Sequence, residues 1–356
     1  MNINNININN HIMGIKHLYK YINENNLEII KDKKFFKNKV VAIDISILLY
    51  QSIIGTRIKT GTDYLDNKGD ISSHILGLFN KIIVMLKNNI IPIFVFDGKP
   101  PRLKNEVIKE RRRKKYLALE KITEDISEEE KVKCLKKCVF ITSQQIKDCK
   151  EMLNIMGIPF IQSIEEADSQ CAYLNKLNIV DGVLTDDMDI LTFGSKYIYK
   201  NLYSIKKKPS VISLESVLTF LDLNYNEFIE LCILLGSDYG KRINVDYKFL
   251  INLYQQNKDI SKCLSLLNNN KIKTDELKKY LEIKEYFSKP KVIDISNNVI
   301  KLKPIDINKL ETFLINRFGF SKQKLLNKLN YLRTRNLKIY NLTDRIYEIN
   351  NINFLI

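Results

Sequence analysis

The chain has no tryptophan, only three histidines, and six cysteines that never form a Cys-x-x-Cys pair. Zinc sites and disulfide frameworks need clustered cysteines and histidines, so this composition argues against both. No apolar run approaches the roughly 20 residues that span a bilayer, and no lipidation motif is present. The first ten residues alternate Asn with Ile and lack the basic start of a signal peptide. We therefore expect a reduced, intracellular protein that does not bind membranes.

Basic residues outnumber acidic ones, with 57 Lys and Arg against 41 Asp and Glu, which gives a formal net charge of +16. Such an excess indicates a polyanionic partner, and nucleic acid is the first candidate. The sequence shows no internal repeat and no Pro/Gly/Ser linker. Its 356 residues allow one large domain or two smaller ones.

Three apolar runs end on aspartate, and they cover residues 40–44, 90–97 and 181–189. Short β-branched runs bounded by Gly, Pro and Asp predict buried parallel strands, and helical patterns lie between them. We therefore expect an α/β fold with a central, mostly parallel sheet flanked by helices. Because an open parallel sheet places its functional groups at the carboxyl ends of its strands, the carboxylates should gather along one edge. Such a cluster needs a cation, and hard divalent ions prefer oxygen ligands.

Seven acidic residues lie at the predicted strand ends, at a helix start, or just after a helix expected near residues 225–235: Asp44, Asp97, Glu166, Asp168, Asp187, Asp189 and Asp238. Each alone has an ordinary explanation as a helix cap or turn residue. In combination they suit two Mg²⁺ ions about 4 Å apart, which can clamp both oxygens of an in-line phosphoryl displacement. Phosphodiester hydrolysis fits such a site, and phosphatase or polymerase chemistry would use the same geometry.

A basic, helical segment follows Asp97 and discriminates among these reactions. Lys104 and Arg111 come seven and fourteen residues after Asp97, which is about two and four helical turns, so both could face the cations from one side of a helix. There they could neutralise charge on a phosphate. The basic run 111–115 has three possible roles: a solvated helix face, a nuclear import signal or a phosphate contact. Its position soon after Asp97 favours the phosphate contact.

Five motifs resemble the flap endonucleases of the structure-specific 5′-nuclease (XPG-like) superfamily, and the likeness runs from Met13 to about Arg333. They cover residues 13–18, 94–104, 166–168, 187–194 and 231–239, with FVFDGKPPRLK as the longest. The resemblance implies a PIN-like nuclease core in which the seven acidic residues hold two Mg²⁺ ions, with Mn²⁺ as a substitute. It also implies that Lys104 and Arg111 contact the scissile phosphate.

Further DNA contacts follow from the resemblance. Tyr50 would stack on the terminal base of the substrate, although an aromatic on an amphipathic helix also suits the core. Arg57 and Lys81 match positions near the duplex junction, where the family's usual arginine at position 81 is here a lysine without the guanidinium fork. Gly14 and Arg112 complete the contacts expected on this side of the substrate.

The implied reaction is phosphodiester hydrolysis at single-strand to double-strand junctions of branched, flapped or nicked DNA. The enzyme would act as a 5′-flap endonuclease and a 5′-3′ exonuclease in replication, repair or recombination. Two alternatives stay open, namely a catalytically silent junction-binding scaffold and an RNA-directed nuclease. The complete acidic set argues against the scaffold, because such carboxylates facing a polyanion would otherwise serve no purpose. We expect a monomer, located in the nucleus of a eukaryotic cell or, for a cytoplasmic DNA virus, in the host cytoplasm.

The chain departs from the family where a Gly-x-Gly turn normally binds K⁺ and grips the duplex. Val245 and Tyr247 replace the two glycines, which disfavours positive φ and close approach to phosphate. One possibility is that binding of the duplex depends on the charges of Lys241, Arg242 and Lys248, in which case the affinity for DNA should fall steeply with salt. The alternative is that the turn is reshaped and the K⁺ site is lost. No sliding-clamp motif is visible in the tail, so clamp recruitment is not expected.

The expected organisation follows the motifs along the chain. It comprises a disordered extension (1–12), an N-terminal nuclease region (13–120), a helical arch (105–140), an internal nuclease region (141–240), a helical DNA-binding region (241–335) and a C-terminal tail (336–356). In the family a glycine directly after the initiating Met lies near the active site. We therefore expect translation to begin at Met13, or else the extension must leave through an open side.

Overall fold

A computed structural model of the chain describes residues 14–60, 64–65, 69, 71–122, 126–127, 129–130, 134–135, 138–204, 207–240, 243–267, 274–295 and 302–335. The expected extension and tail lie outside these residues, as do Lys241 and Arg242. The chain forms two compact units, each built from discontinuous segments. Unit 1 takes residues from 1–32, 100–107 and 168–292, and unit 2 takes residues from 33–99, 108–167 and 293–356.

Unit 2 contains parallel strands that end beside the predicted carboxylates. These are β2 (Val40–Asp44), β3 (Ile91–Phe96) and β4 (Phe160–Gln162), and β3 pairs with both of the others. Every residue of β2 and β3 is buried, which explains why both read as continuous apolar runs rather than alternating ones. Asp44 therefore ends β2 and Asp97 directly follows β3, as the sequence predicted.

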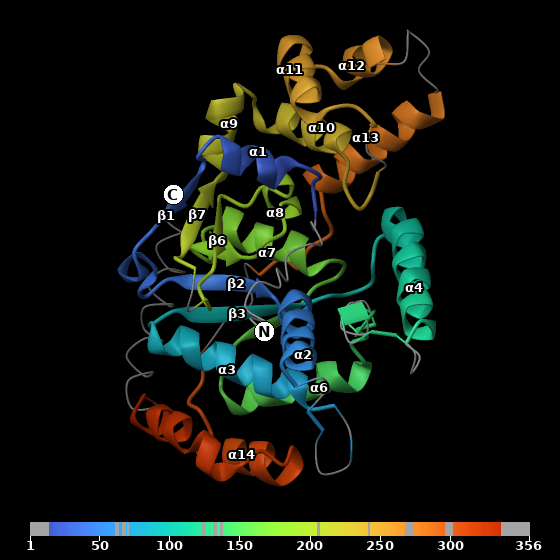
Figure 1. The fold of residues 1–356 in the computed structure, drawn as a ribbon. Helices are drawn as coiled ribbons and strands as arrows, with labels where there is room; N and C mark the ends of the chain where they lie inside the picture. The colour runs from blue at the N-terminus through green and yellow to red at the C-terminus, as the bar shows by residue number, and fades with distance from the viewer. Residues whose placement is uncertain are drawn as a thin grey trace. The chain divides into compact units, whose positions relative to one another are not determined.

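Helices cover this layer of unit 2 (Figure 1). The helix α2 (Ile45–Thr60) packs on α3 (Ser73–Lys87), α3 packs on α6 (Ser143–Ile155), and both α2 and α3 contact β3. A capping box begins α6, because Thr142 and Gln145 exchange side-chain to backbone hydrogen bonds. The helix α14 (Ile307–Thr312) packs on α6 and continues into a π-helical turn, η4 (Phe313–Arg317), before the helical residues 322–335.

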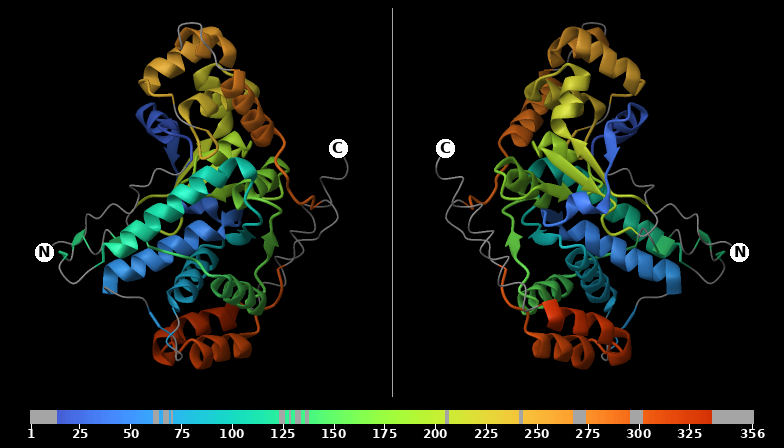
Figure 2. Two further views of the ribbon diagram at one scale, coloured as in Figure 1. Left: turned by 90° about the vertical axis from the view of Figure 1, so that its right-hand side faces the viewer. Right: turned by 90° about the vertical axis from the view of Figure 1, so that its left-hand side faces the viewer.

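The basic segment after Asp97 forms a short 3₁₀ turn, η3 (Arg102–Lys104), followed by the helix α4 (Asn105–Glu120). Ala118 is the one buried side chain of α4, a single continuous helix in the left view of Figure 2, and Lys115 of this helix donates a hydrogen bond to the Tyr50 hydroxyl on α2. Lys104 therefore does not share a regular helix with Arg111, contrary to the prediction. The reason is local: Pro100 and Pro101 fix the backbone before the turn and cannot continue a helical hydrogen-bond ladder.

Unit 1 contributes four strands in the order β1-β7-β6-β5. They are β1 (Glu28–Ile30), β5 (Gly182–Leu184), β6 (Tyr197–Lys200) and β7 (Ser210–Ser213). The β5–β6 pair is parallel, whereas β7 is antiparallel to both neighbours. Asn201 follows β6 and turns the chain with a φ of 60°, and the antiparallel partner β7 comes ten residues after the end of β6.

Helices of unit 1 gather around α10 (Tyr225–Leu235), whose bounds match the prediction. It contacts α8 (Asp189–Thr192), α11 (Tyr247–Asn257), α12 (Ile260–Leu267) and α13 (Thr274–Ser288). The remaining helices of this part are α1 (Leu18–Glu24), α7 (Ala167–Lys176) and α9 (Leu214–Leu221). The expected α/β class with a helical C-terminal region is confirmed. None of the described helices is both long and apolar enough to cross a membrane.

Candidate active site

Three predicted carboxylates lie in unit 2, and one serine joins two of them. The Ser46 backbone N–H donates to Asp44 Oδ1 at 2.7 Å, and its hydroxyl donates to Asp97 Oδ2 at 2.6 Å. Asp97 Oδ1 accepts the Ala167 N–H at 2.9 Å, so the residue next to Glu166 is held at the same place. The structure therefore brings Asp44, Asp97 and the Glu166 segment together, with Asp44 and Glu166 largely buried.

Two carboxylates of unit 1, Asp187 and Asp189, belong to the turn that follows β5. The Asp187 N–H donates to Thr185 Oγ1 at 3.0 Å, and the Asp189 N–H donates to Asp187 Oδ1 at 2.9 Å. Both side chains are buried. Asp168, half-buried in the first turn of α7, is the next carboxylate of this unit along the chain. These two hydrogen bonds, each between residues two apart in the chain, hold the backbone of the turn in place.

Gly14 packs directly against this turn. Its φ is 77°, and a Cβ atom at this position would lie 2.0 Å from Asp187 Oδ1 and 2.9 Å from the Asp189 nitrogen. The chain can approach the carboxylates only because a hydrogen atom replaces a side chain there. The neighbouring Lys16 N–H donates to the Gly236 carbonyl at 2.9 Å, which ties this segment to the end of α10.

Asp238 follows α10 and faces a lysine from the η3 turn. Lys104 Nζ lies 3.6 Å from Asp238 Oδ2, and both side chains are largely buried. The same ammonium lies 5.5 Å from the centroid of the Tyr239 ring, within cation–π range. The Ser-Asp-Tyr motif and the Phe94–Lys104 motif, separated by more than a hundred residues, therefore meet through Lys104.

The donor set fits a hard divalent cation better than any other ligand. Five of the seven predicted ligands are buried, and all seven offer carboxylate oxygens. Buried carboxylates of this kind are stabilised by Mg²⁺, Mn²⁺ or Ca²⁺. Among the described residues, no three His, Cys, Asp or Glu side chains lie close enough together to hold one ion. The fit therefore rests on the chemistry and burial of the donors.

The other predicted DNA contacts of unit 2 take part in local interactions. Arg57 Nη1 donates to the Leu135 carbonyl at 3.1 Å, and Lys81 Nζ donates to Gln51 Oε1 at 2.9 Å. Tyr50 is half-buried on α2, and its hydroxyl accepts a hydrogen bond from Lys115 Nζ at 2.7 Å. Arg111 and Arg112 are exposed on α4.

The segment expected to replace the duplex-gripping turn forms a capped helix start. Asp246 Oδ1 accepts the N–H groups of Lys248 and Phe249, which makes Asp246 the N-cap of α11. The Tyr247 ring is buried and stacks on His17 with centroids 4.9 Å apart. Lys248 Nζ pairs with Glu24 at 3.0 Å. Neither replaced glycine position is among the described residues with positive φ.

Sequence reasoning missed two positioning residues, Ser46 and Lys200. Lys200 is buried at the end of β6, with Nζ 3.5 Å from Asp186 Oδ1 and 3.9 Å from Glu28 Oε2. Burial lowers the pKa of this ammonium, while Glu28 and Asp186 act in the opposite direction. Lys200 reaches Asp186 and Glu28 from another strand, so no local sequence signal points to these contacts. Ser46 had one, because it comes two residues after Asp44 at the start of a helix.

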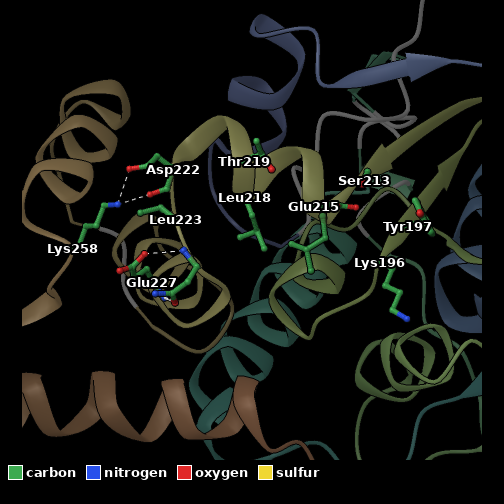
Figure 3. A pocket seen from close by; sticks show the side chains of 12 residues that line it. Lys196, Tyr197, Ser213, Glu215, Leu218, Thr219, Asp222, Leu223, Glu227 and Lys258 are labelled. Carbon is green, nitrogen blue, oxygen red and sulfur yellow. Dashed lines mark hydrogen bonds and ion pairs between the residues drawn. The ribbon is translucent and has the colours of Figure 1, made fainter. Parts of the chain in front are cut away.

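A separate hollow of about 770 Å³ lies in unit 1, between β6, β7 and the helices α9 and α10 (Figure 3). Its polar groups are paired with one another: Lys258 Nζ contacts Asp222 Oδ2 at 2.7 Å, and Glu227 accepts the Asn224 N–H at 2.8 Å. None of the seven predicted metal ligands lines it. This hollow is therefore separate from the predicted active site.

Two regions of the chain match models of known protein families. Residues 13–118 match the XPG N-terminal domain, and residues 157–238 match the XPG I-region. Flap endonuclease 1 of Caenorhabditis elegans is 35% identical over 333 residues, covering 90% of this chain and 86% of that protein. The human protein of the same name is 36% identical over 324 residues, covering 88% and 84%.

Solved structures agree with the sequence matches. Flap endonuclease-1 from Methanococcus jannaschii superposes with a TM-score of 0.67 at 31% identity, covering 89% of this chain and 96% of that one. The catalytic core of Rad2 in complex with DNA substrate gives a TM-score of 0.69 at 27% identity, covering 90% and 100%. The resemblance found in the motifs is thus confirmed, and the chain belongs to the XPG-like family of structure-specific 5′ nucleases as a flap endonuclease homologue.

Proposed function

We propose that this nuclease uses Mg²⁺ to hydrolyse phosphodiester bonds where a single-stranded 5′ segment meets duplex DNA. The observation that carries the proposal is the Lys104–Asp238 pair, which places a cation suited to a phosphate beside one of the predicted metal ligands. The relatives named flap endonuclease point to a 5′ flap as the substrate. Complexes of the Rad2 catalytic core with DNA support DNA rather than RNA as the polymer.

Metal binding is assigned to the seven carboxylates. The family is divalent-metal dependent, and we assign Asp44, Asp97, Glu166, Asp168, Asp187, Asp189 and Asp238 as ligands of two Mg²⁺ ions, which Mn²⁺ can replace. When bound, such ions supply Lewis acidity to the phosphate and activate the attacking water. Ser46 and Gly14 serve this set by holding Asp44, Asp97 and Asp187 in defined positions.

Cationic side chains would then bind the polyanion on either side of the scissile bond. Lys104 and Arg111 contact the scissile phosphate and offset the negative charge that builds up in the transition state. Tyr50 stacks on the base at the junction. The products carry a 5′-phosphate and a 3′-hydroxyl.

The duplex is bound by lysines and arginines as point charges. Arg57, Lys81, Arg112, Lys241, Arg242 and Lys248 are the proposed phosphate contacts. The ion pair of Lys248 with Glu24 would open when DNA binds, because a phosphate can replace the carboxylate as its partner. The capped start of α11 offers no glycine turn for a K⁺ site. Flaps, nicks and other branched DNA arising in replication, repair or recombination are the proposed substrates, bound by a monomer in the nucleus or in a virus-infected cytoplasm.

A substrate panel tests this function. Labelled 5′-flap DNA, nicked duplex DNA and RNA of matched sequence are incubated with the full chain, with Mg²⁺ and with a chelator. We expect Mg²⁺-dependent cleavage of the flap near the junction and slower 5′-3′ digestion at the nick. Junction binding without cleavage would instead favour a scaffold, and cleavage confined to RNA would favour an RNA-directed nuclease.

A further inference from the structure

Two aromatic side chains are exposed beside Tyr50. Tyr116 on α4 has 52% of its surface exposed, and Phe140, in the segment before α6, has 39% exposed. Their ring centroids lie 5.7 Å apart with an interplanar angle of 43°. Soluble proteins usually bury such rings, and an exposed pair in contact marks an interaction surface more often than an isolated one does.

One lysine links this pair to Tyr50. Lys115 Nζ lies 4.7 Å from the Tyr50 centroid and 5.1 Å from the Phe140 centroid. It also donates to the Tyr50 hydroxyl at 2.7 Å and to the Val139 carbonyl at 2.8 Å. The ammonium therefore lies between the Tyr50 and Phe140 rings, and Tyr116 joins them through its contact with Phe140. All of these residues belong to unit 2.

The surroundings of the rings are strongly basic. Arg111, Arg112, Arg113 and Lys114 precede Lys115 on α4 and are all exposed. Glu110 is the acidic residue that pairs with two of them, Arg113 and Lys114. An excess of positive charge around stacked rings matches single-stranded nucleic acid, whose phosphates and base faces need both features at once. An apolar protein surface would offer no negative charge to pair with these basic side chains.

We propose that Tyr116 and Phe140 extend the Tyr50 contact into a stacking platform for consecutive bases of the single-stranded 5′ segment, with Lys115 neutralising the phosphates between them. The inference rests on the proposed function, because the single strand must leave the junction past Tyr50. Stacking on aromatic faces is tolerant of sequence, since every base has a π face. The platform should therefore recognise the bases of a flap without reading their identity.

A substrate with missing bases tests the platform. The affinity of the full chain, without Mg²⁺, is measured for a 5′ flap with normal bases and for one whose first four flap nucleotides are abasic. We expect the unmodified protein to bind the abasic flap about tenfold more weakly. The Tyr116→Ala/Phe140→Ala double variant should bind both flaps equally, at the weaker affinity. A double variant that keeps the full preference for bases would overturn the proposal.

Two matched controls keep the test specific. Leu119→Ala removes an exposed apolar side chain from the same helix without removing a ring and should leave the preference unchanged. Tyr116→Phe keeps the ring and should also behave like the unmodified protein. A 2-aminopurine in the flap reports stacking directly: its fluorescence should be quenched by the unmodified protein and recover in the double variant. Unquenched fluorescence with the unmodified protein would refute stacking.

The nicked duplex separates this inference from the proposed function. If the protein cleaves nicked DNA with Mg²⁺ but binds both flaps equally, the platform is wrong and the nuclease assignment stands. If it cleaves neither the flap nor the nick, the proposed function itself has failed.

Discussion

At the scale of single residues, the candidate site depends on one missing side chain, at Gly14, as well as on charged side chains. Gly14 approaches Asp187 because it has no side chain, and Lys104 reaches Asp238 because the 3₁₀ turn ends at that lysine. The motifs predict the seven carboxylates as metal ligands, and this assignment stays a prediction. Local patterns do not record the hydrogen bond from Ser46 to Asp97, which lies 51 residues further along the chain. They also do not record the contacts of Lys200 with Glu28 and Asp186, which lie on other segments.

Substituting Gly14 tests the first of these contacts. In Gly14→Ala the new methyl group would lie where Asp187 Oδ1 lies, so the carboxylate must move. A displacement of about 1 Å at a reacting centre costs on the order of 10²-fold in rate. We expect that loss in the flap-cleavage rate, together with a higher Mg²⁺ concentration for half-maximal activity. Gly55→Ala is the control, because its Cβ would meet nothing within 4 Å; equal rates for the two variants would contradict the assignment.

Lys104 can be separated from its neighbours on the same basic segment. Replacing it by Gln removes the charge beside Asp238, and loss of one such group typically lowers the rate on the order of 10²-fold to 10³-fold. The affinity for flap DNA should change much less, since many other cations bind the phosphates. Single-turnover cleavage and binding are measured side by side. Lys109→Gln, on the exposed surface of α4, should leave the rate near that of the unmodified protein.

At the scale of elements, helices with local signals could be predicted, and short strands with distant partners could not. The helix α10 begins with the Asn224–Glu227 capping box and ends at Gly236, so both limits are written in adjacent residues. The strands β1 and β7 are three and four residues long. They pair with each other although they are far apart in the sequence, with Glu28 opposite Ile212. The three residues Glu28–Ile30 alone do not show whether the segment is a strand or a loop, because the strand is defined by its pairing with β7.

The cap of α10 matters because Asp238 follows the far end of that helix. Replacing the N-cap by Ala in Asn224→Ala leaves the Glu227 N–H without its side-chain acceptor, which should lower the free energy of unfolding by about 1 kcal/mol. Urea denaturation measures this loss. Asn224→Asp keeps an acceptor and should be nearly as stable as the unmodified chain, whereas equal losses in both variants would show that the cap contributes little.

At the scale of the whole molecule, the family and the α/β class could be predicted because the motifs are long and ordered. The division into two units with interleaved segments could not, since it depends on which distant segments pack together. Within unit 2, a buried polar network links α3, α6 and η4. His74 Nε2 lies 3.6 Å from Asp148 Oδ2, and Asp148 Oδ1 also accepts hydrogen bonds from Gln144 and Arg317.

This network makes global stability depend on pH. Burial lowers the pKa of His74 to about 4, although the Asp148 carboxylate acts in the opposite direction. Below the ordinary histidine pKa of about 6.5 the unfolded chain binds a proton that the folded chain does not, so stability falls as the pH decreases from about 6.5 towards 4. We expect His74 to account for a loss of about 2 kcal/mol between pH 7 and pH 5. In His74→Gln, urea denaturation should show that much less pH dependence. An unchanged pH dependence would mean that folding does not lower the pKa of His74.

The central claim, that the buried carboxylates hold the metals for phosphodiester cleavage, is tested most directly by Asp187→Asn. The substitution keeps the oxygen that accepts the Asp189 N–H and removes only the charge. Single-turnover cleavage of a 5′-flap substrate in Mg²⁺ and flap affinity without Mg²⁺ are measured on the same preparation. We predict a loss of rate on the order of 10³-fold with unchanged affinity. Cleavage by the variant at the rate of the unmodified protein would contradict the account.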